Sequence, residues 1–137
     1  MSFKIFELTH TCNEGYDGAD MLFFAYDEMQ VAESILDEIK KYAKSGDENS
    51  KGYEYVCIFA TMNPKCIGNV INKDIKNYND DDLRFAKLIT KTMTGEMLLD
   101  AMAQSNVDGD SYFQVGLHEY KLDNVVQLTS EKHHVAV

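Results

Sequence analysis

The stretch MLFFAYDEMQVAESILDEIKKYA, from Met21 to Ala43, decides the fold, because a short apolar run leads directly into an amphipathic segment. The run Met21–Tyr26 is apolar and aromatic and follows a loop rich in glycine and aspartate, which predicts a buried strand. Apolar side chains then recur at helical spacing, at Val31, Ile35, Ile39 and Tyr42, with Ala32, Leu36 and Ala43 beside them. The stretch therefore predicts a strand followed by a helix whose apolar face packs on a sheet.

Local signals mark both ends of the predicted helix. Asp27 can act as the N-cap, since its carboxylate can accept a backbone N–H of the first turn, and Gln30 stands where a capping box requires Glu or Gln. Glu28 in the first turn and lysines near the last turn match the helix dipole. Gly46 is suited to ending the helix in the left-handed conformation, so the helix is expected to stop just before it.

Elsewhere in the chain, apolar runs and turn residues predict further elements. Strands are expected at Phe3–Leu8, Tyr53–Ala60, Cys66–Ile71, Tyr112–Leu122 and Val125–Thr129. A helix is expected to begin within Asn77–Asp82, capped by Asn79 or Asp80, and Glu96–Gln104 either continues it or forms a second helix. Most of these strands are expected to pair with the next strand along the chain as hairpins. We therefore expect an α+β fold with a mostly antiparallel sheet of about five to six strands and two or three helices on one face. Residues 1–137 are expected to form a single domain, in which 129–137 either fray or add an edge strand.

The composition is acidic and contains little arginine. The net charge is −10, and the 13 basic residues include a single arginine, Arg84. Arginine is the usual residue for bidentate contacts to phosphate, so direct binding to DNA or RNA is disfavoured. The three cysteines are an odd number, the N-terminus resembles no secretory signal, and no apolar stretch reaches the length of about 18 residues that a membrane span requires. We therefore expect a cytoplasmic protein with reduced cysteines and no membrane contact.

Carboxylates are concentrated in the predicted loops and at one helix start. The candidate partner-binding residues are Asp17, Asp20, Asp80, Asp81, Asp82, Asp108 and Asp110. Loops and helix starts can gather at one edge of an α+β sheet, where an array of carboxylates would imitate phosphates and attract a basic protein. The alternative is that these loops point in different directions and that the charge only keeps the protein soluble.

A second candidate site is the loop around His10 and Cys12, which offers an imidazole and a thiol. Cys12 is expected to be the most reactive thiol, whereas Cys57, in the middle of a predicted strand, is expected to be buried and inert. The cysteine and histidine spacing matches no zinc motif. The segment Asn106–Asp110 resembles the start of a calcium loop, but the glycine and glutamate that distinguish such loops do not follow it. No metal ion and no cofactor are therefore expected.

Two classes of function remain. The favoured class is a small, acidic, non-enzymatic binding protein whose carboxylate-rich surface binds a basic partner protein. An example would be a phage-type accessory or inhibitory protein that occupies the nucleic-acid site of a host factor, since the preference for Lys, Asn, Ile and Tyr is typical of AT-rich genomes. The alternative is a small enzyme or ligand-binding domain with its site at the His10–Cys12 loop.

Overall fold

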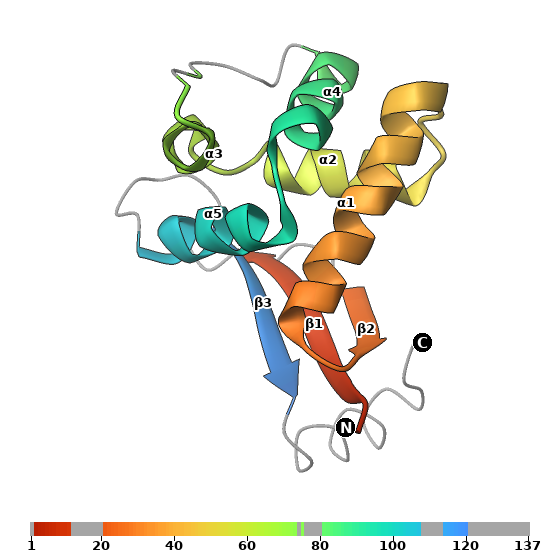
Figure 1. Ribbon diagram of the computed structural model, residues 1–137, viewed down its shortest axis with the longest axis vertical. Coiled ribbons are helices and arrows are strands. Elements are labelled where there is room, and N and C mark those ends of the chain that lie inside the picture. The colour runs from red at the N-terminus through yellow and green to blue at the C-terminus, as the bar shows by residue number, and fades with distance from the viewer. Residues whose placement is uncertain (1, 12–20, 74, 76–80, 108–113, 121–137) are drawn as a thin grey trace.

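The protein folds into three strands and five helices within the residues that the structure describes, which are 2–11, 21–73, 75, 81–107 and 114–120 of a computed structural model (Figure 1). In chain order these elements are β1 (Lys4–Thr11), β2 (Met21–Ala25), α1 (Glu28–Ser45), α2 (Lys51–Phe59), α3 (Pro64–Ile71), α4 (Asp82–Thr92), α5 (Gly95–Val107) and β3 (Gln114–Tyr120). None of the helices in these ranges is long and apolar enough to cross a membrane.

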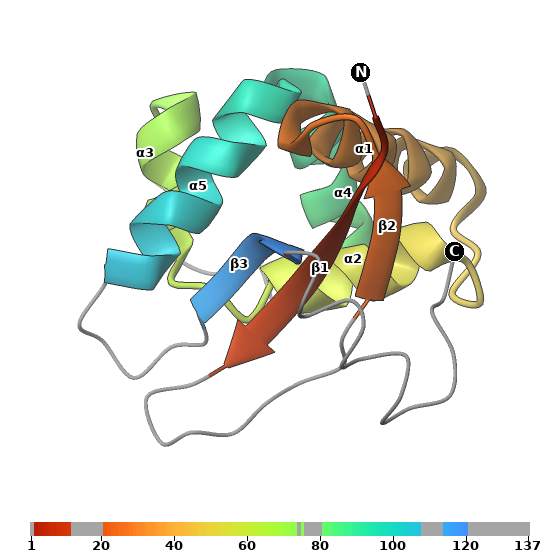
Figure 2. The same cartoon turned by 90° about the horizontal axis from the view of Figure 1, so that it is seen from below.

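The sheet has the order β2-β1-β3, with both pairs antiparallel. Ile5 of β1 lies opposite Phe24 on one side and Tyr120 on the other, which fixes the register of the three strands. Phe6 and Leu8 of β1, Ala25 of β2 and Val115 of β3 are buried in the core. The helices gather on one side of the sheet, where α5 packs against β3 and α1 packs against β2 (Figure 2).

The expected α+β class is confirmed, but the expected sheet of five to six strands with two or three helices is wrong. Two segments predicted as strands, Tyr53–Ala60 and Cys66–Ile71, form most of α2 and α3. The return strand Val125–Thr129 and the edge or frayed tail at 129–137 lie outside the described residues. The first predicted hairpin is confirmed, because β1 pairs antiparallel with β2, and β3 forms within the expected Tyr112–Leu122.

Helix α1 forms where its sequence signals place it. The Asp27 carboxylate accepts the backbone N–H of Gln30 at 2.9 Å, and Gly46 ends the helix at a φ of 68° while its N–H donates to the Tyr42 carbonyl at 2.7 Å. The Gln30 side chain differs from the expected capping box in its partner. Its Oε1 accepts the backbone N–H of Tyr26 at 2.8 Å, whereas in a capping box it would accept the backbone N–H of the N-cap residue, Asp27. The apolar stripe of α1 is buried, and Ile35 and Ile39 have no exposed surface.

Helices α2 and α3 replace the predicted strands because each has its own N-cap. The Ser50 hydroxyl accepts the backbone N–H of Tyr53 at 3.3 Å, and the Asn63 side chain accepts the N–H of Lys65 at 3.0 Å. Pro64 occupies the first turn of α3, where the missing N–H of proline costs nothing. Both helices are short, and their apolar runs are rich in β-branched and aromatic residues, which is why the sequence favoured strands.

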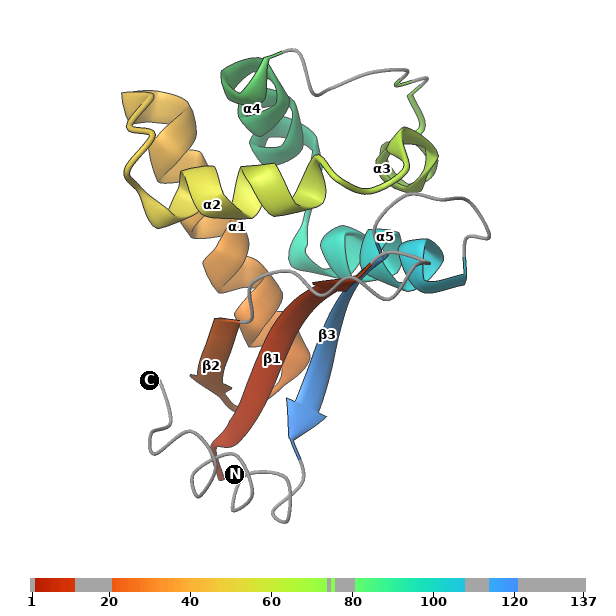
Figure 3. The same cartoon turned by 180° about the vertical axis from the view of Figure 1, so that it is seen from behind.

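Helices α4 and α5 are two separate helices joined by a short extended link. Met93 ends α4 in an extended conformation, and the Thr94 hydroxyl accepts the backbone N–H of Met97 in the first turn of α5. The N-cap of α4 is Asp81, not the expected Asn79 or Asp80. At the other end of α5, the buried Ser105 hydroxyl bonds to both the N–H and the carbonyl of Val115 at 3.0 Å, which ties this helix to β3. Figure 3 shows α3 beside α5, and the two helices are in contact.

Candidate functional site

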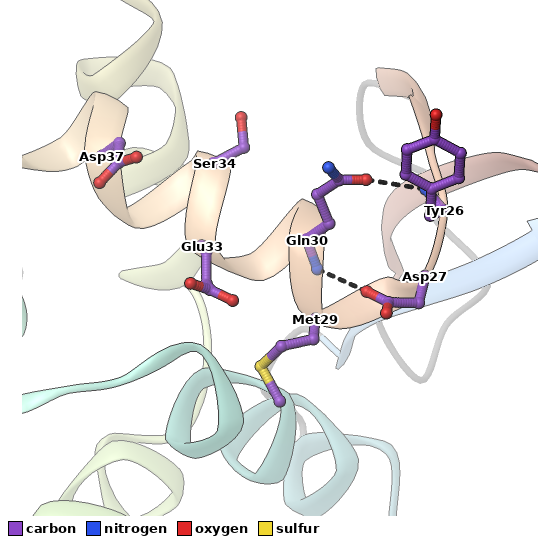
Figure 4. Close-up of a pocket in the computed structure, with 7 residues that line it drawn as sticks. All are labelled: Tyr26, Asp27, Met29, Gln30, Glu33, Ser34 and Asp37. Carbon is purple, nitrogen blue, oxygen red and sulfur yellow. Dashed lines mark hydrogen bonds between the residues drawn. The ribbon is translucent and has the colours of Figure 1, made fainter. Parts of the chain in front are cut away.

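An open groove of about 550 Å³ runs along the outward face of the N-terminal half of α1 (Figure 4). Its lining residues are Tyr26, Asp27, Met29, Gln30, Glu33, Ser34 and Asp37. We call this surface the acidic groove, because three of its seven residues are carboxylates. All three, Asp27, Glu33 and Asp37, are exposed to solvent.

The sequence places these side chains together through the cap and the helical repeat of α1. Asp27 is held at the helix start by its bond to the Gln30 N–H, and Glu33 and Asp37 stand one turn apart on the same face. In Figure 4, Met29 and Glu33 project toward the neighbouring helix, whereas Gln30 and Ser34 project away from it. Gly95, at the start of α5, packs so closely here that an added Cβ would lie 2.9 Å from both Met29 Sδ and Glu33 Cγ.

The carboxylates of the acidic groove have no cationic partner within the described part of the chain. The two ion pairs found there join Lys4 to Glu119 and Lys41 to Glu38. Favourable charges near a helix end are explained by the helix dipole only within the first or last turn. The dipole therefore accounts for Glu28, but not for Glu33 and Asp37, which lie further along the helix.

Positive charge is confined to the other half of α1. Lys40, Lys41 and Lys44 line a smaller neighbouring groove of about 350 Å³ together with Ser34, Asp37 and Glu38. The outward face of α1 thus changes from acidic to basic along its length. A cationic ligand would be attracted to the N-terminal half and repelled by the C-terminal half.

Exposed aromatic rings border the acidic groove. Phe3 and Tyr26 stack with their ring centroids 4.2 Å apart and their planes inclined by 17°. Phe3 is 61% exposed, and Tyr26, which lines the groove, is 36% exposed. An aromatic face beside carboxylates suits a lysine or arginine side chain, because the ring attracts the cation while the carboxylates neutralise it.

The helix-start residues Asp81 and Asp82 lie at a different place, near the C-terminal end of α1. The Asp81 carboxylate accepts the N–H of Arg84 at 3.0 Å, so it caps α4. The charges of Asp82 and Glu48 act on Tyr42, Tyr53 and Cys57, which shows that these groups share one region. Of the other predicted partner-binding residues, Asp17, Asp20, Asp80, Asp108 and Asp110 all lie outside the described residues.

Cys57 is exposed on α2, so the prediction that it is buried in a strand is wrong, and Cys66 is the buried cysteine of the described pair. Partial burial raises the pKa of the Cys57 thiol, and the charges of Asp82 and Glu48 raise it further, while a hydrogen bond from the Tyr53 hydroxyl opposes them. The same hydrogen bond, with the nearby negative charges, raises the pKa of Tyr53 to about 12. A thiol with a raised pKa is mostly protonated at neutral pH, which makes it a weak nucleophile.

The alternative site around His10 is described only in part. His10 is a half-buried residue of β1 that pairs with Val115 of β3, and Cys12 lies outside the described residues. Within the ranges that the structure describes, no three or more His, Cys, Asp or Glu side chains are grouped so that they could hold a metal ion. The predicted reactivity of Cys12 stays a prediction.

Comparison with protein-family models, with curated proteins and with solved structures found no match. The acidic groove itself was missed by the sequence reasoning, which assigned no role to Glu33 or Asp37. A usable signal was present, because residues 27, 30, 33, 34 and 37 all lie opposite the apolar stripe of a well-predicted helix.

Proposed function

We propose that this protein is a small, acidic, non-enzymatic binding protein that recognises a basic surface on a partner protein. The observation that carries the proposal is the acidic groove, where Asp27, Glu33 and Asp37 line one hollow without a cationic partner in the described part of the chain. Carboxylates that this chain leaves unpaired are available to pair with lysine or arginine on another protein.

The overall charge favours the same kind of partner. At a net charge of −10 the protein attracts a basic protein over a distance of about one Debye length, which is roughly 8 Å at physiological salt. The same charge repels DNA and RNA, so we propose no direct contact with nucleic acid. Nucleic-acid-binding host proteins are a suitable class of partner, because their surfaces are basic in order to bind phosphate. A phage accessory or inhibitory protein would target a protein of this kind.

The acids predicted from the sequence remain part of this proposal. Asp81 and Asp82 sit at the far end of α1 from the acidic groove, where they form a second acidic region with Glu48. Asp17, Asp20, Asp80, Asp108 and Asp110 stay predicted contacts. We propose that the acidic groove makes the central contact, since its carboxylates line a hollow beside exposed aromatic rings.

The test is a pull-down from lysate of the native host with tagged protein, at low and at high salt. Three proteins are compared with the unaltered chain. The groove variant carries Asp27→Asn, Glu33→Gln and Asp37→Asn, and the helix-start variant carries Asp80→Asn, Asp81→Asn and Asp82→Asn. A control variant with the same change in net charge carries Glu54→Gln, Asp100→Asn and Glu119→Gln, which neutralise exposed carboxylates outside both acidic regions.

We expect a partner that is retained at low salt and lost at high salt, with affinity reduced by about tenfold in the groove variant because each lost charge pair contributes up to about 1 kcal/mol. The control variant should bind nearly as well as the unaltered chain. Equal losses in all three variants would show that net charge alone attracts the partner. Binding of short DNA or RNA by the protein at physiological salt would contradict the proposal.

A further inference from the structure

The two grooves on α1 form one continuous surface, because both are lined by Ser34 and Asp37. We call this surface, made of the lining residues of both grooves, the α1 face. Glu33 and Asp37 stand toward its N-terminal end, and Lys40 and Lys44 stand toward its C-terminal end. Both signs of charge are therefore present on one surface, at opposite ends.

These four charged side chains are exposed and form no ion pair in the described part of the chain. In Figure 4, Glu33 leans toward the neighbouring helix, but it remains exposed. The helix dipole explains Lys44, which lies in the last turn, but not Lys40, which lies before it. The ion pair that the α1 face does contain in these ranges joins Lys41 to Glu38. The four side chains are therefore available to pair with charges on another molecule.

The charges form a row whose order is reversed in an antiparallel copy. Glu33, Asp37, Lys40 and Lys44 follow one another at intervals of four, three and four residues, which places them in one line along the helix. The order along this line is acid, acid, base, base. An antiparallel copy of the same line presents base, base, acid, acid, and because the intervals are symmetric, every charge meets the opposite charge in a single register.

We propose that the α1 faces of two copies of this chain pack antiparallel about a two-fold axis and form a homodimer. Glu33 of one copy then pairs with Lys44 of the other, and Asp37 pairs with Lys40. The two-fold axis makes each of these pairs occur twice, as in any interface that uses the same surface on both subunits. Parallel packing would set like charges opposite one another, so the charges specify the antiparallel arrangement.

The dimer is weak and reversible. Exposed ion pairs contribute little individually, and the net charge of −10 on each copy opposes association. At physiological salt the repulsion between the two copies is screened beyond roughly 8 Å, whereas paired groups lie within about 4 Å and keep more of their attraction. The dimer is therefore expected at high protein concentration and physiological salt.

Dimerisation covers part of the acidic groove. Glu33 and Asp37 cannot pair with a second copy and with a basic partner at the same time, so only the dissociated chain is fully available to such a partner. The inference goes beyond the proposed function and does not depend on it, because the oligomeric state is measured on this chain alone. The pull-down from lysate tests the basic partner separately.

The experiment exchanges the charges at each end of the row. The base-only variant carries Glu33→Lys and Asp37→Lys, and the acid-only variant carries Lys40→Glu and Lys44→Glu. Neither variant can form the four pairs with itself, but a mixed dimer of the two forms all four with opposite charges. Both variants keep a negative net charge, so net charge alone does not attract one to the other.

Two control variants carry the same changes in net charge at exposed residues outside the α1 face. One carries Asp100→Lys and Glu119→Lys, and the other carries Lys65→Glu and Lys73→Glu. Sedimentation velocity measures the oligomeric state of each full-length protein at physiological salt. The concentration is raised from about 10 μM to about 1 mM, which covers the weak affinities expected of exposed charge pairs. Circular dichroism confirms that every variant is folded.

We expect the unaltered chain and each control variant to dimerise as the concentration rises. The base-only and acid-only variants should each dimerise about tenfold or more weakly, because attractive pairs become repulsive. An equimolar mixture of these two variants should recover the dimer, which misfolded chains could not do.

Three results would overturn the inference. The first is an unaltered chain that stays monomeric over the whole concentration range. The second is a dimer that persists in the base-only and acid-only variants, which would place the interface on another surface. The third is a mixture of the two variants that stays monomeric, which would mean that the row of charges does not set the pairing.

Discussion

Gly52 allows α2 to cross α1 at very short range. It is buried near the start of α2, and a Cβ added there would overlap the backbone carbonyl of Glu38 in α1. A carbonyl in the middle of a helix cannot turn aside as a flexible side chain can. Any larger residue at this position must therefore push the two helices apart.

We predict that Gly52→Ala destabilises the protein by about 1 to 3 kcal/mol or more, although alanine favours helix formation. Urea denaturation followed by circular dichroism measures the free energy of unfolding. Lys51→Ala is the matched control, because Lys51 is the exposed neighbour in the same helix turn and its loss should change stability by less than about 0.5 kcal/mol. If the two variants have equal stability, α1 and α2 do not cross as closely as described.

Tyr55 couples stability to alkaline pH. Burial, together with the charges of Glu38 and Glu54, raises the pKa of Tyr55 to about 12, whereas a tyrosine in an unfolded chain titrates near about 10. A group whose pKa is higher in the folded state binds its proton more tightly there. Its contribution to stability is therefore complete below pH 10 and is lost as the pH rises toward 12.

We predict that the free energy of unfolding falls between about pH 10 and pH 12, and that Tyr55→Phe makes this fall less steep. Some dependence should persist in the variant, because the pKa values of Tyr42 and Tyr53 are also raised. Chemical denaturation at a series of pH values provides the measurement. An unchanged slope in Tyr55→Phe would mean that the Tyr55 hydroxyl is solvated in the folded protein.

At the scale of elements, α1 is the helix on which the others are assembled. It contacts α2, α4 and α5 as well as β2, and Ile39 lies fully buried on its apolar stripe. Removing buried methylene groups from such a position costs both the lost transfer free energy and the cavity that remains.

We predict that Ile39→Ala lowers the free energy of unfolding by about 2 to 5 kcal/mol. The exposed neighbour Lys40 supplies the control, since Lys40→Ala should remain within about 0.5 kcal/mol of the unaltered protein. Guanidinium denaturation compares the two variants. A loss below about 0.5 kcal/mol in Ile39→Ala would show that the stripe is not buried.

The helices differ in how well their sequences predicted them. For α1, the cap at Asp27, the apolar spacing and the glycine at 46 all indicate one structure, and they fix both ends. For α2 and α3, the apolar runs are too short to tell a helix from a strand by spacing alone, and their β-branched and aromatic residues favoured a strand. The decisive residues were the caps, because Ser50 and the pair Asn63–Pro64 begin helices just before two segments that the sequence analysis assigned to strands.

At the scale of the whole molecule, the composition indicates an acidic surface but does not say which carboxylates lie together. The net charge of −10 indicated an acidic surface, and the reasoning placed that surface in loops and at the start of α4. The acidic groove on α1 is a further acidic surface, and it faces solvent because the opposite face of that helix is buried by other elements. All of the groove's lining residues fall within 26–37, so the apolar stripe of α1 was the local signal that could have located it.

The change from acidic to basic residues along α1 also gives the outward face of this helix an electric dipole of its own. The acidic end of this face carries Asp27, Glu33 and Asp37, and the basic end carries Lys40, Lys41 and Lys44. The electric field of a charged partner therefore acts in opposite directions on the two ends of the helix. A positively charged group that approaches this face of α1 is drawn toward Asp27, Glu33 and Asp37 and away from the three lysines. Fewer encounters would then be wasted on wrong orientations, and this gain in association rate would fade as salt shortens the reach of the field.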